Sequence, residues 1–192
     1  MRCVCVFDKK NLKIYTNRIM SKTNLDSVQN LSLRERPVDI FFMVIFSIFF
    51  ITSCIADMIP ALGINFDNPS ANFIVNANHW YADGGTDKLF QNPPFWMKII
   101  ISLSAFVYMP FYAILVVSIW RGWNRIQLFC VIYATMIACN TGIIVFGVEF
   151  FGEPEWRTEN PVKFLLFNLP YVLIPITLLI RMRKPLPFTR KF

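Results

Sequence analysis

Only a few polar side chains interrupt the apolar stretches of this chain, and they limit the chemistry that it can carry out. Asp57 closes one such stretch, in the sequence Ile55-Ala56-Asp57-Met58-Ile59-Pro60. A carboxylate in a membrane-spanning segment is costly unless it is paired or faces a wet cavity. Asp57 could therefore be the counter-ion of a cationic, lipophilic ligand or the anchor of a hydroxyl group. The alternative is an interfacial carboxylate that caps the end of a helix.

Other polar candidates lie in two further apolar stretches. Ser104 and Tyr108 are polar members of one stretch, and Tyr133 and Asn140 belong to the next. Asn140 stands in a segment without charges, so its amide should seek a partner on another helix.

Three prolines also stand inside apolar stretches, namely Pro110, Pro170 and Pro175. Each removes a backbone hydrogen bond and kinks its helix. Kinked helices splay and leave room between them, which favours an internal cavity. Simple tolerance of kinks in membrane helices is the alternative.

Common catalytic motifs are not found in the sequence. It has no glycine-rich phosphate loop, no nucleophile elbow and no HExxH sequence. The single histidine, His79, falls in an aromatic connection without a cysteine partner, which argues against zinc. We therefore expect no catalytic residue, no metal and no cofactor.

The composition indicates what must position these residues. Of the 192 residues 55% are apolar and only 16% are charged, against roughly 25% charged in soluble domains. The mean hydropathy is +0.47. There are too few charges to cover a soluble domain, so we predict an integral membrane protein.

Four stretches are long enough to cross a bilayer, which takes about 20 mostly apolar residues. They cover residues 38–58, 97–120, 126–148 and 162–182. Charges at their ends, such as Asp39 and Lys163, can reach the interface and do not count against the assignment. A soluble bundle would show polar stripes, but Ile40–Phe50 contains only Ser47. The predicted fold is an all-α membrane protein, a four-transmembrane-helix bundle with proline-kinked helices around a ligand cavity.

Basic residues predict the orientation. They gather before the first span, between the second and third spans, and after the fourth. The loops 59–96 and 149–161 are acidic instead, the second through Glu149, Glu153, Glu155 and Glu159. The positive-inside rule puts both termini in the cytosol. The net charge of +7 then reflects topology and gives no reason to invoke nucleic acid.

The predicted organisation has three parts. Residues 1–36 form a basic, flexible cytosolic extension, residues 37–183 the four-span domain, and residues 184–192 a basic cytosolic tail.

Several motifs together resemble the sigma-2 receptor family of the EXPERA superfamily. The similarity runs from about Pro37 to Arg183 and is carried by short sequences in matching order. They are Asp57 with Pro60, Trp80-Tyr81-Ala82, Asp87, Gln91, Pro93-Pro94, Trp96-Met97-Lys98, Met109-Pro110-Phe111, Ile132-Tyr133 and Pro170-Tyr171-Val172-Leu173-Ile174-Pro175.

This resemblance implies a four-helix bundle in the endoplasmic reticulum membrane, with the nuclear envelope and the lysosomal membrane as other locations. It also implies a homodimer, a cavity for sterols and lipophilic amines, and association with the Niemann–Pick type C cholesterol transporter. Asp57 matches the carboxylate that binds the ligand amine, and Asp87 a supporting aspartate. Tyr133 and Tyr171 match positions that line the pocket. The family's glutamate in the second span falls at Ser104 here, so a proton-sharing pair with Asp57 is lost.

The leading hypothesis is a receptor-like protein that binds sterols and lipophilic amines beside membrane lipid and acts in cholesterol homeostasis. Its ligand-binding residues would be Asp57, Asp87, Ser104, Tyr108, Tyr133, Asn140 and Tyr171. One alternative is a sterol isomerase, which needs an acid and a base near the ring carbons. A second alternative is a structural adaptor in the membrane.

Overall fold

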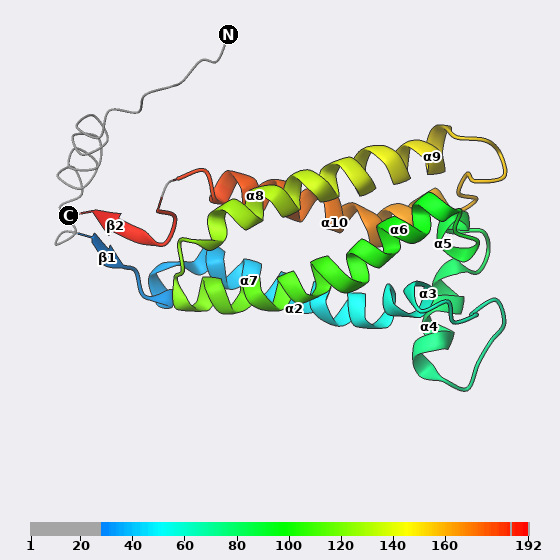
Figure 1. Cartoon of the computed structure of the whole chain (residues 1–192), viewed down its shortest axis with the longest axis horizontal. Helices are drawn as coiled ribbons and strands as arrows, with labels where there is room; N and C mark the ends of the chain where they lie inside the picture. Colours follow the sequence, from blue (N-terminus) through cyan, green and yellow to red (C-terminus); the bar gives the residue numbers. More distant parts are fainter. Residues whose placement is uncertain (1–27, 185, 192) are drawn as a thin grey trace, which may run out of the picture.

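The computed structural model describes residues 28–184 and 186–191, and its elements form an elongated helical bundle (Figure 1). The first 27 residues of the predicted flexible extension lie outside this range. In chain order the elements are β1 (Val28–Asn30), η2 (Leu33–Glu35), α2 (Pro37–Ile55), α3 (Met58–Ala61), α4 (Phe73–Ala82), α5 (Lys88–Gln91), α6 (Phe95–Leu103), η3 (Ser104–Tyr108), α7 (Met109–Arg121), α8 (Ile126–Ile137), η4 (Ala138–Val145), α9 (Phe146–Phe151), α10 (Pro161–Arg181) and β2 (Thr189–Lys191).

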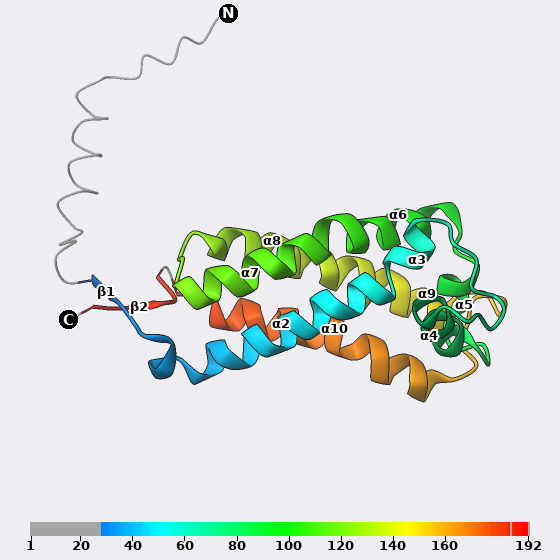
Figure 2. The ribbon, with the colours of Figure 1, turned by 90° about the horizontal axis from the view of Figure 1, so that it is seen from below.

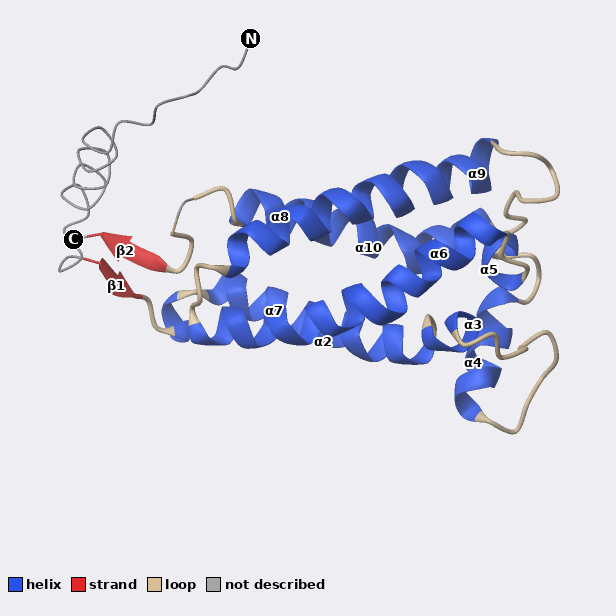
Figure 3. Cartoon of the chain, viewed as in Figure 1, coloured by secondary structure: helices blue, strands red, loops and turns tan. Residues whose placement is uncertain are grey.

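Four continuous helical segments are long and apolar enough to cross a membrane. They cover Pro37–Ile55, Phe95–Arg121, Ile126–Phe151 and Pro161–Arg181. The predicted four-span helical fold is thereby confirmed, with boundaries that differ by at most three residues. Helix dominates the described chain, and the strands are one short pair at the end of the bundle (Figure 3).

Each span is apolar on all sides, yet only a narrow face is covered by protein. In α2 the buried apolar positions are Phe42, Phe46 and Phe49, spaced by three or four residues. That spacing places them on one helix face. The other apolar residues of α2, such as Val44 and Ile48, remain exposed, as expected of a helix that meets lipid.

Two spans contain π-helical turns where their regular hydrogen bonding changes. The η3 turn ends two residues before Pro110, and the N–H of Met109 bonds to the carbonyl of Ser104, five residues back. Pro110 has no N–H to offer the preceding turn, and a wider turn is one way in which a helix adapts to this. The η4 turn interrupts the third span in the same way. Pro170 and Pro175 lie inside α10.

The spans pack in neighbouring pairs, α2 with α7 and α8 with α10. Their buried aromatic rings form the main core, where Tyr112 and Phe46 are fully covered. Figures 1 and 2 show the spans along the long axis of the molecule, with the strands at one end and α3 to α5 at the other. We call these the strand end and the cavity end.

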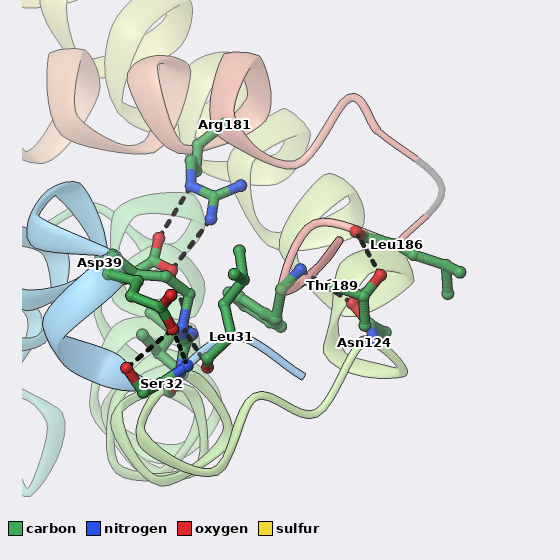
Figure 4. A network of polar contacts seen from close by, with 11 residues as sticks. Leu31, Ser32, Asp39, Asn124, Arg181, Leu186 and Thr189 are labelled. Atoms are coloured by element: carbon green, nitrogen blue, oxygen red, sulfur yellow. Dashed lines mark hydrogen bonds and ion pairs between the residues drawn. The ribbon is translucent and has the colours of Figure 1, made fainter. Parts of the chain in front are cut away.

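The strand end is closed by a buried ionic cluster (Figure 4). Asp39 is 1% exposed and accepts hydrogen bonds from Arg36 Nη1 at 3.0 Å and from Arg181 Nε at 2.8 Å. The Phe188 ring lies 5.1 Å from the Arg36 guanidinium carbon and 5.6 Å from that of Arg181. Asp39, the charge at the start of the first span, is therefore paired by two arginines inside the bundle.

Candidate functional site

A cavity of about 300 Å³ lies among the four spans at the cavity end of the bundle. Its walls come from the end of α2, from α4 and α5, from α6 and η3, from η4, and from α10. Most of the lining is apolar, for example Ile100, Ile101 and Val145. Sites for small molecules typically occupy roughly 300–1,000 Å³ and combine an apolar wall with a few polar groups. The space therefore suits a small lipophilic molecule.

Asp57 stands in the wall of this cavity because the helix breaks there. The first span ends at Ile55 and α3 begins at Met58, so Asp57 lies in the joint between them. Its side chain makes no capping hydrogen bond to α3. Instead, Ser104 Oγ donates a hydrogen bond of 2.6 Å to Asp57 Oδ2. The carboxylate is therefore bonded to the second span and does not cap α3.

Ser104 reaches Asp57 from the first residue of the π turn in the second span. At this position the resemblance implied a glutamate and a shared proton. The serine supplies a hydroxyl donor in its place, and a hydrogen bond to a charged acceptor is stronger than one between neutral groups. Asp57 is thereby held toward the cavity without a second negative charge beside it.

Tyr171 lines the same cavity from α10. Its ring stacks on Phe49 of α2, with centroids 4.2 Å apart and planes at 18°. Its hydroxyl also forms a hydrogen bond with Thr52 Oγ1. These contacts fix the first span against the fourth beside Asp57.

A second polar group lies where α4 and α5 meet α10. Asp87 caps α5 by accepting from the N–H of Phe90 at 2.8 Å, and it accepts from Tyr81 Oη at 2.8 Å. Asn168 Nδ2 donates to Tyr81 Oη at 2.6 Å. Asp87, Tyr81 and Asn168 all line the cavity, so its polar wall extends well beyond Asp57.

Burial changes the acidity of this second group. Asp87 is 4% exposed, and its burial raises the pKa of its carboxyl above the ordinary value, against smaller opposing effects of its hydrogen bonds. Burial likewise raises the pKa of the Tyr81 hydroxyl, and the neighbouring Asp87 charge raises it further. Tyr81 therefore remains a protonated donor.

Three other candidates lie beside the cavity and do not line it. Tyr108 and Tyr133 are 2% and 3% exposed and pack edge to face with centroids 5.4 Å apart. Asn140 Nδ2 donates to Tyr108 Oη at 3.1 Å, and Tyr133 Oη donates to Tyr112 Oη at 3.3 Å. Asn140 thus has the interhelical partner that the sequence predicts. This cluster joins the second and third spans within the core.

Several polar residues of the wall are not among those predicted from the sequence. Asn168 and Thr52 line the cavity from the fourth and first spans, and each is a polar residue in an apolar segment. Asn78 lines it from α4, where its Nδ2 donates to the carbonyl of Ile55 at 2.8 Å. Nothing in the sequence shows that α4 folds back against the spans. His79 does not line the cavity, and its Nδ1 forms a hydrogen bond of 3.1 Å with the carbonyl of Phe66.

Comparison with known families decides the relationship. A family model described as EXPERA (EXPanded EBP superfamily) matches residues 73–182, more than half of the chain. The chain belongs to the EXPERA family. This matched range begins at α4 and includes the last three spans, so Asp57 lies before it.

A curated relative of this EXPERA protein is Sigma intracellular receptor 2 from Xenopus tropicalis. The two chains are 30% identical over 113 residues, which cover 54% of this chain and 64% of the relative. The alignment therefore spans less than two thirds of the relative's length. No solved structure matches this EXPERA chain. The family resemblance inferred from the motifs is thus confirmed.

Proposed function

We propose that this membrane protein binds a sterol or another lipophile that carries an amine or a hydroxyl group, and that it acts in cholesterol homeostasis and trafficking. It does so as a receptor-like protein without catalysing a reaction. The observation that carries the proposal is the cavity of about 300 Å³ with its Asp57–Ser104 hydrogen bond. A relative named as an intracellular receptor supports binding as the activity.

The geometry gives each part of the wall a role. Ser104 holds Asp57 Oδ2, so the carboxylate faces the ligand in a fixed orientation. A ligand ammonium or hydroxyl would donate to this carboxylate. The apolar body of the ligand would lie against the isoleucine, valine and phenylalanine side chains of the wall, whose burial drives binding.

Lipid mass spectrometry on the purified protein tests this proposal. Ala77 lines the cavity, so Ala77→Phe should fill part of it. The matched control is Ala71→Phe in the exposed loop before α4. We expect the wild-type protein and the control to retain a sterol that Ala77→Phe loses. Equal lipid content in all three proteins would contradict the proposal.

A second candidate is a sterol isomerase, because the EXPERA superfamily includes such enzymes and two carboxyl side chains, Asp57 and Asp87, line the cavity. Moving a double bond requires an acid and a base near the ring carbons. Expression in a yeast strain without sterol isomerase tests this activity. Restored growth would replace the binding function with a catalytic one.

The proposal extends to cellular context. The protein resides in the endoplasmic reticulum membrane with both termini in the cytosol, forms a homodimer and associates with the Niemann–Pick type C cholesterol transporter. A carboxy-terminal epitope tag should be reached by antibody after the plasma membrane alone is permeabilised. Cross-linking in membranes should yield a dimer and a complex with the transporter, and their absence would remove these partners.

A further inference from the structure

Two carboxyl side chains meet at the cavity end of the bundle, away from Asp57. Asp87 stands at the start of α5 and Glu149 in α9, and they are 4% and 1% exposed. Glu149 Oε1 accepts from the N–H of Leu89, two residues after Asp87, so the two carboxyl groups are neighbours. Glu149, expected from the sequence to be a charge of an acidic loop, is instead buried in a helix.

The hydrogen bonds around the pair leave one carboxyl oxygen without a donor. Both oxygens of Asp87 already accept, Oδ1 from the N–H of Phe90 and Oδ2 from Tyr81 Oη. Glu149 Oε1 accepts from the N–H of Leu89 at 3.4 Å, but Oε2 is buried and meets no donor within the described chain. Two ionised carboxylates have no hydrogen to share. A proton on Glu149 Oε2 satisfies that oxygen and lets it donate to Asp87.

The surrounding charges agree with a single negative charge on the pair. The titratable groups that interact with it are Tyr81 from α4 and Lys88 from α5. Lys88 Nζ pairs with Glu159 Oε1 at 2.8 Å, so this cation is engaged at the surface. Two buried negative charges without a closely paired cation would be very costly.

The pair is joined to the cavity by a directed chain of hydrogen bonds. Tyr81 gives its one hydroxyl hydrogen to Asp87, so its oxygen accepts from Asn168 Nδ2. Asn168 Nδ2 also donates to the carbonyl of Phe164 at 3.0 Å. The amide nitrogen of Asn168 is thereby fixed, and its Oδ1 is the acceptor that this side chain offers to the cavity.

We propose that Glu149 is a positioning residue of the binding cavity. Its protonated carboxyl group donates a hydrogen bond to Asp87 and thereby holds Asn168 Oδ1 as a second acceptor for the ligand. The favoured ligands are lipophiles with a second hydrogen-bond donor besides the group that Asp57 holds. This inference rests on the proposed binding function.

The arrangement predicts that ligand binding weakens as the pH rises. Because two adjacent buried negative charges are costly, the pair keeps its shared proton above the ordinary carboxyl pKa of about 4. The proton, and with it the contact, is lost only as the pH rises further. Loss of the proton leaves two buried negative charges that repel each other. This repulsion loosens the series of hydrogen bonds that ends at Asn168.

Binding of a tritiated sterol that carries a hydroxyl and no amine tests the inference, because this ligand does not titrate. Full-length protein in detergent is compared from about pH 6 to about pH 9 with its variants. Wild-type binding should weaken on the alkaline side. Glu149→Gln keeps a donor but has no titratable proton, so it should bind as tightly as wild type at neutral pH and lose the alkaline weakening.

Glu149→Ala removes the donor and should bind roughly tenfold more weakly, as for one lost hydrogen bond to a charged group. Glu153→Gln in the exposed loop is the control and should keep the wild-type profile. If Glu149→Gln fails to restore binding or keeps the wild-type pH profile, the inference is wrong while the binding function stands. If the wild-type protein binds no sterol at any pH, both fail. Should Glu149→Ala not fold, the glutamine variant alone decides.

Discussion

At the scale of single residues, a hydroxyl replaces a carboxyl beside the ligand-facing aspartate. Ser104 donates to Asp57 at 2.6 Å, at the position where the resemblance implied a glutamate. This serine removes the second carboxyl group beside Asp57, so Asp57 has no carboxyl partner with which to share a proton. Two neighbouring carboxyl groups occur instead at Asp87 and Glu149, away from Asp57.

Ser104→Ala should therefore destabilise the protein through its effect on Asp57. Removing the donor leaves an acceptor oxygen without its partner, which costs about 1–3 kcal/mol in the free energy of unfolding. The measurement is thermal unfolding in detergent. Ser102→Ala on the same helix, outside the cavity lining, is the control. An Ser104→Ala protein as stable as this control would show that the hydrogen bond contributes nothing.

At the scale of elements, departures from regular helix place the site. Asp57 reaches the cavity because α2 ends two residues before it, and Ser104 begins the π turn that precedes Pro110. Hydropathy predicts the length of each span, since it reports how many apolar residues follow one another. It does not predict a π turn, whose hydrogen bonds depend on the neighbouring helices.

The turn between the second and third spans depends on a glycine. Gly122 ends α7 with φ of +69°, and side chains with a Cβ are strained there. Gly122→Ala should lower the free energy of unfolding by about 1 kcal/mol. Gly147→Ala is a matched control, because a Cβ there meets open space within a helix, and it should be neutral or stabilising by about 0.5–1 kcal/mol. Equal stabilities of the two variants would contradict this account.

At the scale of the whole molecule, the two ends of the bundle have different tasks. The strand end joins the residues before the first span to those after the fourth, through the antiparallel β1–β2 pair and the ionic cluster around Asp39. The cavity end holds the ligand site. The closed end thereby fixes the spans, while the opposite end retains space between them.

Asp39→Asn tests the contribution of the closed end. It leaves two arginines without their carboxylate in a buried site, and breaking such a group costs about 3–5 kcal/mol. The expected result is a much lower unfolding temperature in detergent. Asp83→Asn in an exposed turn should behave as wild type. An Asp39→Asn protein as stable as the wild type would show that the cluster does not stabilise the fold.

The sequence predicts the fold better than it predicts the contacts between distant residues. Four spans and the position of Asp57 follow from local apolar runs and their exceptions. The pairing of Asp39 with Arg181 and of Asp87 with Glu149 does not, because each joins residues separated by more than 60 positions. The same reason explains why Asn168 was missed and why Tyr108, Tyr133 and Asn140 lie in the core beside the cavity.

The most direct test of the binding function is saturation binding of a tritiated lipophilic amine to purified protein. Asp57→Asn keeps the shape of the side chain but removes the charge, while Asp67→Asn changes an exposed loop carboxylate. We predict that Asp57→Asn lowers affinity by roughly a hundredfold, as for a lost charge-assisted contact in a dry site, and that Asp67→Asn leaves it unchanged. Equal affinity of Asp57→Asn and wild type would contradict the account.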